Sequence, residues 1–250
     1  MAKNEIVKVD AGQFALVTQG QEIGEILREN LSGARIRPFD LDMVHVPSGG
    51  STTWEVPTLD GTEGVKEIQG VIVGQKIVRG FWATSYDTNP GVPPICSSDN
   101  GEFGYGDPLG VGEASRHECA TCKMNEWGSD PRGGKGKACG EKKLLFIMRQ
   151  DDLVPIVVVA PPTSLGNIQS FFLRLGSKGI RYYHAVVGLA LKAAQNGAGL
   201  KYSVIEPRFI EAVPEEFRGA YTKYVREFAP VISQVTVEQT VEKEAGEAVA

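Results

Sequence analysis

The pattern of apolar positions along the chain predicts a mainly β protein built on one long strand. Residues 65–82 are rich in β-branched side chains, which predicts a single strand or two strands bent at Gly74. Glycines at positions 70 and 80 are typical of bulges or bends in a curled sheet. We therefore expect this segment to be the first strand of a small curled structure.

Further apolar runs predict shorter strands joined by turns. Early hairpin strands are expected at residues 41–46 and 52–56, with a separate turn at Asp60-Gly61. Later runs predict a hairpin at residues 144–148 and 154–159, and two more strands at residues 182–191 and 200–210. The run at 182–191 also fits a helix, and its tyrosine and valines favour a strand.

Three segments have helical periodicity. Residues 14–31 predict a short amphipathic helix, with isoleucines and leucines on one face. Thr163 or Ser164 can cap a second helix that ends at Leu175, before Gly176. A third helix is expected to start at Pro214 or Glu215 and to end at Pro230.

The order of these elements is that of a small barrel. A five-stranded OB barrel has the same order, with its helix between the third and fourth strands, and the cysteine-rich insertion would be the loop between strands 1 and 2. We therefore predict a mainly β (α+β) fold, with a five-stranded OB-like barrel and flanking helices. The barrel would span residues 61–230, with an insertion at about 88–140 between strands 1 and 2. A helix-and-hairpin extension would precede it over residues 1–60, and a flexible acidic tail would follow over residues 231–250.

Composition and charge narrow the class of protein. The 250 residues are 42% hydrophobic and 23% charged, which excludes a disordered or membrane-embedded chain. No apolar run approaches the ~20 residues of a membrane helix, and no signal peptide is apparent, so a cytoplasmic protein is expected. Residues 131–205 carry a net charge of +8 within a chain of net charge −5. Lysines can cluster by chance, but the more specific interpretation is a basic face that binds a polyanion.

Four cysteines lie in or beside residues 61–140, a stretch that holds about half of the 30 glycines. They are Cys96, Cys119, Cys122 and Cys139. A two-residue gap lets two thiolates occupy adjacent corners of a zinc tetrahedron, and zinc bonds could replace a missing hydrophobic core. The spacing therefore predicts a structural Zn²⁺ that staples the insertion. His117 as the fourth ligand, a redox pair and unconnected thiols remain alternatives.

Aromatic and basic side chains are interspersed in the basic region. This mixture fits a single-stranded nucleic acid, because aromatic rings stack on bases and cations bind phosphates. Expected phosphate contacts are Lys135, Lys137, Lys142, Lys143, Arg149 and Arg181, and expected stacking side chains are Tyr105, Trp127 and Tyr183. Trp127 is expected to be exposed, because a zinc loop has little core to bury it. No phosphate-binding Walker loop and no serine-nucleophile motif occurs. Asp151-Asp152 is better explained as a turn than as a catalytic pair, so no enzyme is predicted.

Several segments together resemble a known family. PPICSSDNG, CATCKMNEWGS, GKGKACGEKKLLFIM and PIVVVAPPTSL are similar to segments of zinc-containing OB-fold single-stranded-DNA-binding proteins of bacteriophages and mobile elements. The resemblance covers about residues 65–210, and its motif residues are the four cysteines. It implies an OB fold, a structural zinc, and a role in DNA replication or recombination in the cytoplasm of a bacterial host. The acidic tail resembles tails that recruit replication or recombination proteins, but it lacks their acidic-aromatic tip.

The sequence therefore predicts a largely sequence-independent binder of single-stranded DNA. A strand-annealing recombination protein would share these contacts and also form rings or filaments. A zinc-stapled structural or protein-interaction module would use the basic face for a protein partner instead.

Overall fold

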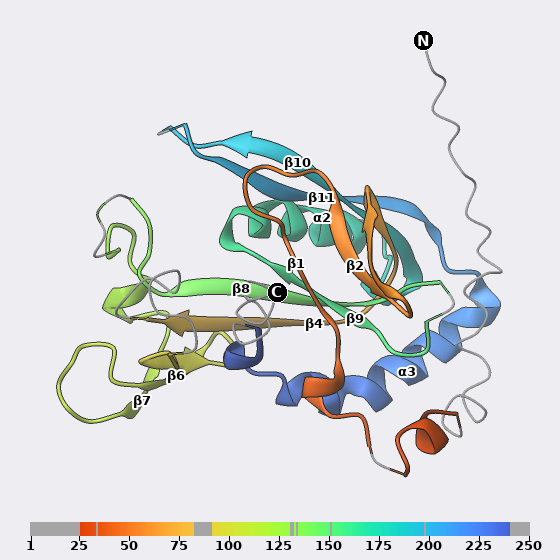
Figure 1. Cartoon of the computed structure of the whole chain (residues 1–250), viewed down its shortest axis with the longest axis horizontal. Coiled ribbons are helices and arrows are strands. Elements are labelled where there is room, and N and C mark those ends of the chain that lie inside the picture. The colour runs from red at the N-terminus through yellow and green to blue at the C-terminus, as the bar shows by residue number, and fades with distance from the viewer. Residues whose placement is uncertain are drawn as a thin grey trace.

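One mixed sheet of nine strands forms the body of the molecule, and a separate two-stranded hairpin lies beside it (Figure 1). The computed structural model describes residues 26–33, 35–82, 92–130, 133, 135–150, 152–197 and 199–240. The strands are Met43–His45 (β1), Trp54–Thr58 (β2), Gly61–Val65 (β3), Glu67–Phe81 (β4), Cys96–Ser98 (β5), Phe103–Gly106 (β6), Ser115–Glu118 (β7), Gly140–Met148 (β8), Ile156–Ala160 (β9), Ala185–Gln195 (β10) and Lys201–Ala212 (β11). The longer helices are Leu165–Ser177 (α2) and Glu215–Gln234 (α3), and the 3₁₀ helices are Pro38–Asp40 (η2), Lys123–Asn125 (η4), Pro162–Ser164 (η5) and Tyr182–His184 (η6).

Strand β4 is the long strand that the β-branched sequence predicts, and the structure places it at the centre of the sheet. It pairs antiparallel with β8 along one edge, and with β10 and then β5 along the other. The register with β8 shifts between Ile72 and Gly74, which places an irregularity at the expected bend. A Cβ at Gly74 would meet the terminal methyl group of Ile232 of α3, so the absence of a side chain leaves room for Ile232 to pack on the strand.

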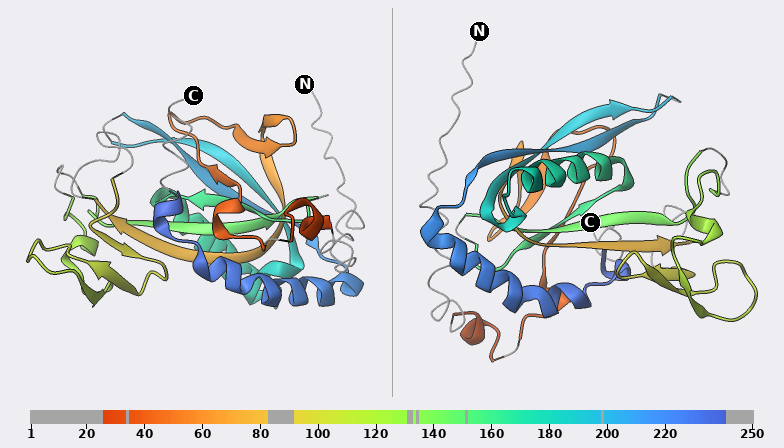
Figure 2. Two further views of the ribbon diagram at one scale, coloured as in Figure 1. Left: turned by 60° about the horizontal axis from the view of Figure 1, so that its bottom comes forward. Right: turned by 180° about the vertical axis from the view of Figure 1, so that it is seen from behind.

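The two faces of the sheet are buried in two separate hydrophobic clusters. Ile72 and Leu145 belong to the cluster that α2 covers, whereas Val73 and Phe146 belong to the cluster that α3 covers. Figures 1 and 2 show α2 and α3 on opposite sides of the β4–β8 pair. This three-layer arrangement confirms the predicted mainly β, α+β class. Helix α2 also follows its predicted bounds, because Ile168, Phe171 and Leu175 recur at helical spacing and are all buried.

The sheet does not close into the predicted barrel, because no ladder joins β9 to β11 among the described residues. The free edge of β9 is taken instead by β1, which pairs with it in parallel. On β11, the backbone of Ile205 is bonded by side chains that flank the start of α2. Its N–H donates to Ser164 Oγ at 3.0 Å, and its carbonyl accepts from Asn167 Nδ2 at 3.0 Å. The backbone N–H and C=O of Ile205 are therefore bonded to side chains at the start of α2 rather than to β9.

The early hairpin is also paired differently from the expectation. β2 pairs with β3 across the turn at Asp60, while β1 joins the main sheet. Trp54 accounts for this arrangement, because its side chain is fully buried and its Nε1–H donates to the Leu189 carbonyl at 2.8 Å. Burying that large ring against β10 fixes β2 outside the β1–β9 ladder. Of the helix expected at residues 14–31, residues 26–30 are helical, and residues 14–25 lie outside the described residues.

The chain after β11 is packed against the sheet over a longer stretch than expected. Helix α3 continues through Pro230 to Gln234, and Val235 and Val237 are buried against the sheet beyond it. Lys76 of β4 holds this segment, since its Nζ donates to the Ser233 carbonyl at 2.7 Å and to the Val235 carbonyl at 2.5 Å. The flexible tail expected from residue 231 is thus structured up to residue 240, and residues 241–250 lie outside the described residues. In the described ranges, no helix is both long and apolar enough to span a membrane.

We predict that Ser164→Ala destabilises the protein by about 1–3 kcal/mol, because it leaves the buried N–H of Ile205 without an acceptor. Urea unfolding measures the loss. Ser177→Ala, at the exposed end of the same helix, is the matched control and should change stability by less than about 0.5 kcal/mol. Equal effects of the two substitutions would show that the Ser164 bond does not hold α2 to β11.

Candidate nucleic-acid interface

Strand β6 separates aromatic from glycine positions, because successive side chains of a strand point to opposite faces. Its sequence Phe-Gly-Tyr-Gly places Phe103 and Tyr105 on one face and two glycines on the other. On the glycine face, a Cβ at Gly104 would lie 3.0 Å from Cys96 Sγ, and a Cβ at Gly106 would clash with the backbone of β5. The glycines therefore allow β5 to pack closely, which leaves the aromatic face pointing outward.

The aromatic face of β6 carries a cation from the neighbouring strand. Arg116 of β7 pairs in register with Tyr105, and its guanidinium lies 3.9 Å from the centroid of the Phe103 ring. Tyr105 is 64% exposed, which leaves its ring open to a planar ligand. A guanidinium stacked on an aromatic ring is a combination that single-stranded nucleic acid binders use. Phe103 and Arg116 were not among the predicted contacts. The alternation of aromatic residue and glycine in β6 could have indicated Phe103, whereas Arg116 is brought beside it only by the pairing of β6 with β7.

A second exposed aromatic lies farther along the insertion. Trp127 is 79% exposed, as predicted, and Lys137 Nζ lies 5.2 Å from the centroid of its ring. The position of the lysine is fixed, because Lys137 Nζ also donates to Asn125 Oδ1 at 3.0 Å. Asn125 in turn donates to the Cys119 carbonyl at 2.8 Å and accepts from Arg79 of β4 at 2.7 Å. The Trp127–Lys137 pair is thereby tied to the central strand.

The charge of the insertion is mixed. Lys135 is exposed near Trp127, yet residues 92–140 contain seven acidic and five basic side chains, so this segment is not uniformly basic. The acidic side chains are Asp99, Glu102, Asp107, Glu113, Glu118, Glu126 and Asp130. Stacking on exposed rings, with a few local cations, is therefore the stronger feature of this surface.

The remaining predicted contacts do not join the insertion surface. Arg149 lies at the opposite end of β8, where its Nε is 2.5 Å from Asp152 Oδ2 and its Nη1 donates to the Pro57 carbonyl. Lys143 is only 8% exposed, with its Nζ 4.8 Å from the centroid of the Phe172 ring, and this burial lowers its pKa. Lys142 is half-buried on the other face of β8.

Arg181 and Tyr183 are also placed away from the insertion, beside the middle of β4. Arg181 is exposed and donates to the Tyr183 hydroxyl at 2.7 Å. The Tyr183 ring itself is half-buried between Tyr182 and His184. The hydroxyl is thus engaged by the arginine and the ring by its neighbours, so this tyrosine does not offer a face for base stacking.

The structure contradicts the predicted zinc site. In the part of the chain that is described, no group of three or more His, Cys, Asp or Glu side chains is arranged to hold a metal ion. All four cysteines are free thiols, and Cys96 Sγ lies 3.3 Å from His117 Nε2. Cys96 and Cys139 belong instead to a small hydrophobic cluster with Phe81, with Met124 packed against it. This cluster and the hydrogen bonds of Asn125 hold the insertion in the way that zinc was expected to.

Comparisons of the chain with protein-family models, with curated proteins and with solved structures found no match. The resemblance to zinc-containing OB-fold DNA-binding proteins of bacteriophages and mobile elements therefore stays a prediction. The assignment of a function depends on the geometry of the described surface.

We predict that Cys122 is the first thiol to react with N-ethylmaleimide, because it is half-buried while the other three cysteines are buried. Burial also raises the pKa of Cys96 to about 11 and that of Cys139 to about 12, which keeps both thiols protonated and unreactive at neutral pH. Peptide mass spectrometry after a short alkylation gives the order. Cys122→Ser should abolish the fast phase, whereas a fast reaction at Cys139 would contradict the packing described here.

Proposed function

We propose that this protein binds single-stranded DNA with little sequence preference, and that the insertion provides the stacking surface. The observation that carries the proposal is Trp127, an indole that is 79% exposed and paired with Lys137. The exposed indole presents a face on which a base can stack, and the lysine beside it supplies a cation for a neighbouring phosphate. The second exposed ring, Tyr105, with Arg116 beside it, supports the same chemistry.

The two aromatic sites favour unpaired bases over a duplex. Every base has a π face that can stack on a tyrosine or tryptophan ring, so stacking tolerates any sequence. In a duplex those faces are already stacked on neighbouring base pairs. Lys137 and Arg116 would contact the phosphates between stacked bases, and Lys135 is exposed close to the same surface.

The topology of the sheet supports an OB-like interpretation. β9, β8, β4, β10 and β11 are neighbours in that order, which is the order of OB strands 3-2-1-4-5 without the closing pair. OB domains bind oligonucleotides with the loops between strands 1 and 2 and between strands 4 and 5. Here these loops are the insertion and the tip of the β10–β11 hairpin, which project from the same side of the molecule in Figures 1 and 2. Lys201, at the base of that tip, is exposed and adds a cation to the hairpin.

This proposal assigns a binding role rather than a catalytic one. Its place in DNA replication or recombination follows from the resemblance of the four cysteine-containing and flanking segments described above. The insertion as a whole has a slight acidic excess, which supports binding through stacked bases more than through a continuous phosphate track.

We predict that Trp127→Ala weakens binding of a fluorescein-labelled oligo-dT by about 1–3 kcal/mol, the usual loss for one base-stacking side chain. Fluorescence anisotropy at low salt measures the affinity. Phe39→Ala is the matched control, because Phe39 is 61% exposed in η2, outside the insertion and the β10–β11 hairpin, and its loss should not change binding. Equal affinities of the two variants would rule out Trp127 as a stacking platform, and no binding by the wild-type protein would rule out the function.

A separate prediction concerns the salt dependence of binding. Replacing Lys135 and Lys137 by alanine should reduce the slope of log affinity against log salt by about 0.7 for each phosphate that the protein no longer neutralises. Lys223→Ala on α3 serves as the control, since that lysine is exposed and lies 3.8 Å from Glu227. An unchanged slope in the double variant would show that these two lysines do not contact phosphates.

A further inference from the structure

Strand β4 has an unpaired stretch in the middle of one edge. On this edge β10 pairs with residues 67–71 and β5 pairs with residues 79–81. Among the described residues, no strand pairs with residues 72–78 on this side. An unpaired edge of this kind exposes backbone donors and acceptors to which another strand can add.

The direction of the backbone groups follows from the ladder next to the gap. The Phe81 carbonyl accepts from the Ile95 N–H, so the backbone groups of residue 81 point toward β5. Because these groups alternate between the two edges of a strand, those of Ile77 and Gln75 point to the same edge. They therefore face the gap, while the groups of Lys76 and Val78 point to β8.

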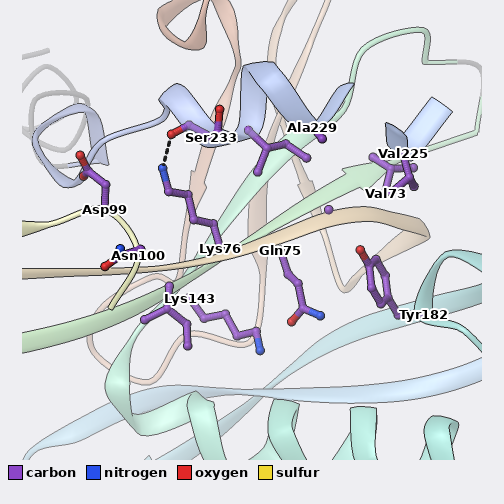
Figure 3. A pocket seen from close by; sticks show the side chains of 13 residues that line it. Val73, Gln75, Lys76, Asp99, Asn100, Lys143, Tyr182, Val225, Ala229 and Ser233 are labelled. Atoms are coloured by element: carbon purple, nitrogen blue, oxygen red, sulfur yellow. Dashed lines mark hydrogen bonds between the residues drawn. The ribbon is translucent and has the colours of Figure 1, made fainter. Parts of the chain in front are cut away.

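A groove of about 590 Å³ surrounds this edge. One wall is formed by Val225, Ala229 and Ile232 of α3, and the ring of Tyr182 lies toward the other side. Figure 3 shows Gln75 and Lys143 extending to one side of β4, while Lys76 extends to the other side, toward Ser233. The groove has apolar walls along a strand edge, which are the features of a site for an extended peptide.

Lys143 provides a charge that the groove leaves unmatched. It is only 8% exposed, and no described carboxylate lies within ion-pair distance of its Nζ. Glu141 on its own strand pairs with Arg79. Asp99, a carboxylate in the lining of the groove, interacts with Lys76 rather than with Lys143. The Phe172 ring below Lys143 supplies only a partial counter-charge, at 4.8 Å. The Lys143 Nζ is not fully enclosed, so an anion that enters the groove can reach it. A partner that covered this ammonium group without supplying an anion would incur a desolvation cost.

We propose that the groove along residues 72–78 of β4 binds an extended segment of a partner protein, which adds a strand to the open edge and places an Asp or Glu carboxylate on Lys143. The backbone groups of Gln75 and Ile77 would pair with the backbone of the added segment. Tyr182 and the α3 wall would contact its alternate side chains. This site is separate from the insertion surface and does not depend on the proposed DNA binding.

A peptide fits this groove better than a nucleic acid strand. The open edge presents N–H and C=O groups in the alternation that a second strand complements, whereas a phosphodiester backbone offers acceptors only. Lys76, the other lysine in the lining of the groove, already donates to the Ser233 and Val235 carbonyls. Lys143 therefore matches one carboxylate, rather than the run of phosphates that a nucleic acid would bring.

The state of the edge can be tested on the free protein by amide hydrogen exchange, followed residue by residue with NMR. The amides of Gln75 and Ile77 should exchange much faster than those of Lys76 and Val78, which point to β8. Slow exchange at all four positions would mean that the edge is already covered, by this chain or by a second copy, and would overturn the proposal.

The partner chemistry can be tested with a displayed library of random heptapeptides selected on the full-length protein. We expect enrichment of peptides with β-branched residues around a fixed Asp or Glu. The enriched peptide, added to the protein, should shift the amide resonances of Gln75 and Ile77. Its affinity should fall about 30-fold or more in Lys143→Met, since the substitution removes one partner of a buried charge pair. Lys143→Arg should retain binding, and Lys223→Met on exposed α3 should leave it unchanged.

Three results would overturn this assignment. The first is a library that yields no acidic motif, and the second is a selected peptide that binds Lys143→Met as tightly as the wild type. The third is oligo-dT that displaces the peptide from the groove, since this would assign the groove to DNA. The melting temperature of each variant, measured alongside, ensures that folded proteins are compared.

Discussion

Burial of both faces of β4 is the constraint on which the rest of the structure depends. Ile72 and Val73, adjacent in sequence, belong to separate hydrophobic clusters, one under α2 and one under α3. A strand whose side chains are apolar on both faces is stable only when both faces are covered. Each Å² of apolar surface removed from water stabilises the folded state by about 25 cal/mol. The positions of α2, α3 and the packed segment after α3 follow from this requirement.

Local patterns were enough to predict the elements that depend on local packing. β4, α2 and the β10–β11 pair follow the periodicity of their sequences closely. The partner of β1 could not be predicted in this way, because Met43 pairs with Val157, far away along the chain. Likewise, a proline usually ends a helix, but α3 continues past Pro230, and Phe228 and Val235 on either side of it are buried in the same cluster. Tertiary packing overrode the local signal in both cases.

In the candidate site, too, local sequence predicts some features and tertiary packing decides others. Trp127 was expected to be exposed because little core surrounds it, and this is what the structure shows. The neighbouring lysines of β8 could not be distinguished from sequence, because adjacent residues of a strand face opposite sides and only the fold decides what covers each side. Cysteine spacing has a similar limit. It indicates that thiols can approach one another, but whether they surround a metal ion or pack with Phe81 depends on the backbone around them.

The insertion leaves and rejoins the body at one point of the sheet, since Gly80 of β4 and Gly140 of β8 are directly paired. Paired residues of neighbouring strands lie about 5 Å apart, a gap that a short turn also spans. Apart from β5, which pairs with β4, the body therefore places little geometric demand on the length of the segment between these two glycines. Such an arrangement lets evolution lengthen, shorten or replace the ligand-facing module while the two hydrophobic cores stay as they are. The surface that meets the ligand and the scaffold that supports it can consequently change at different rates.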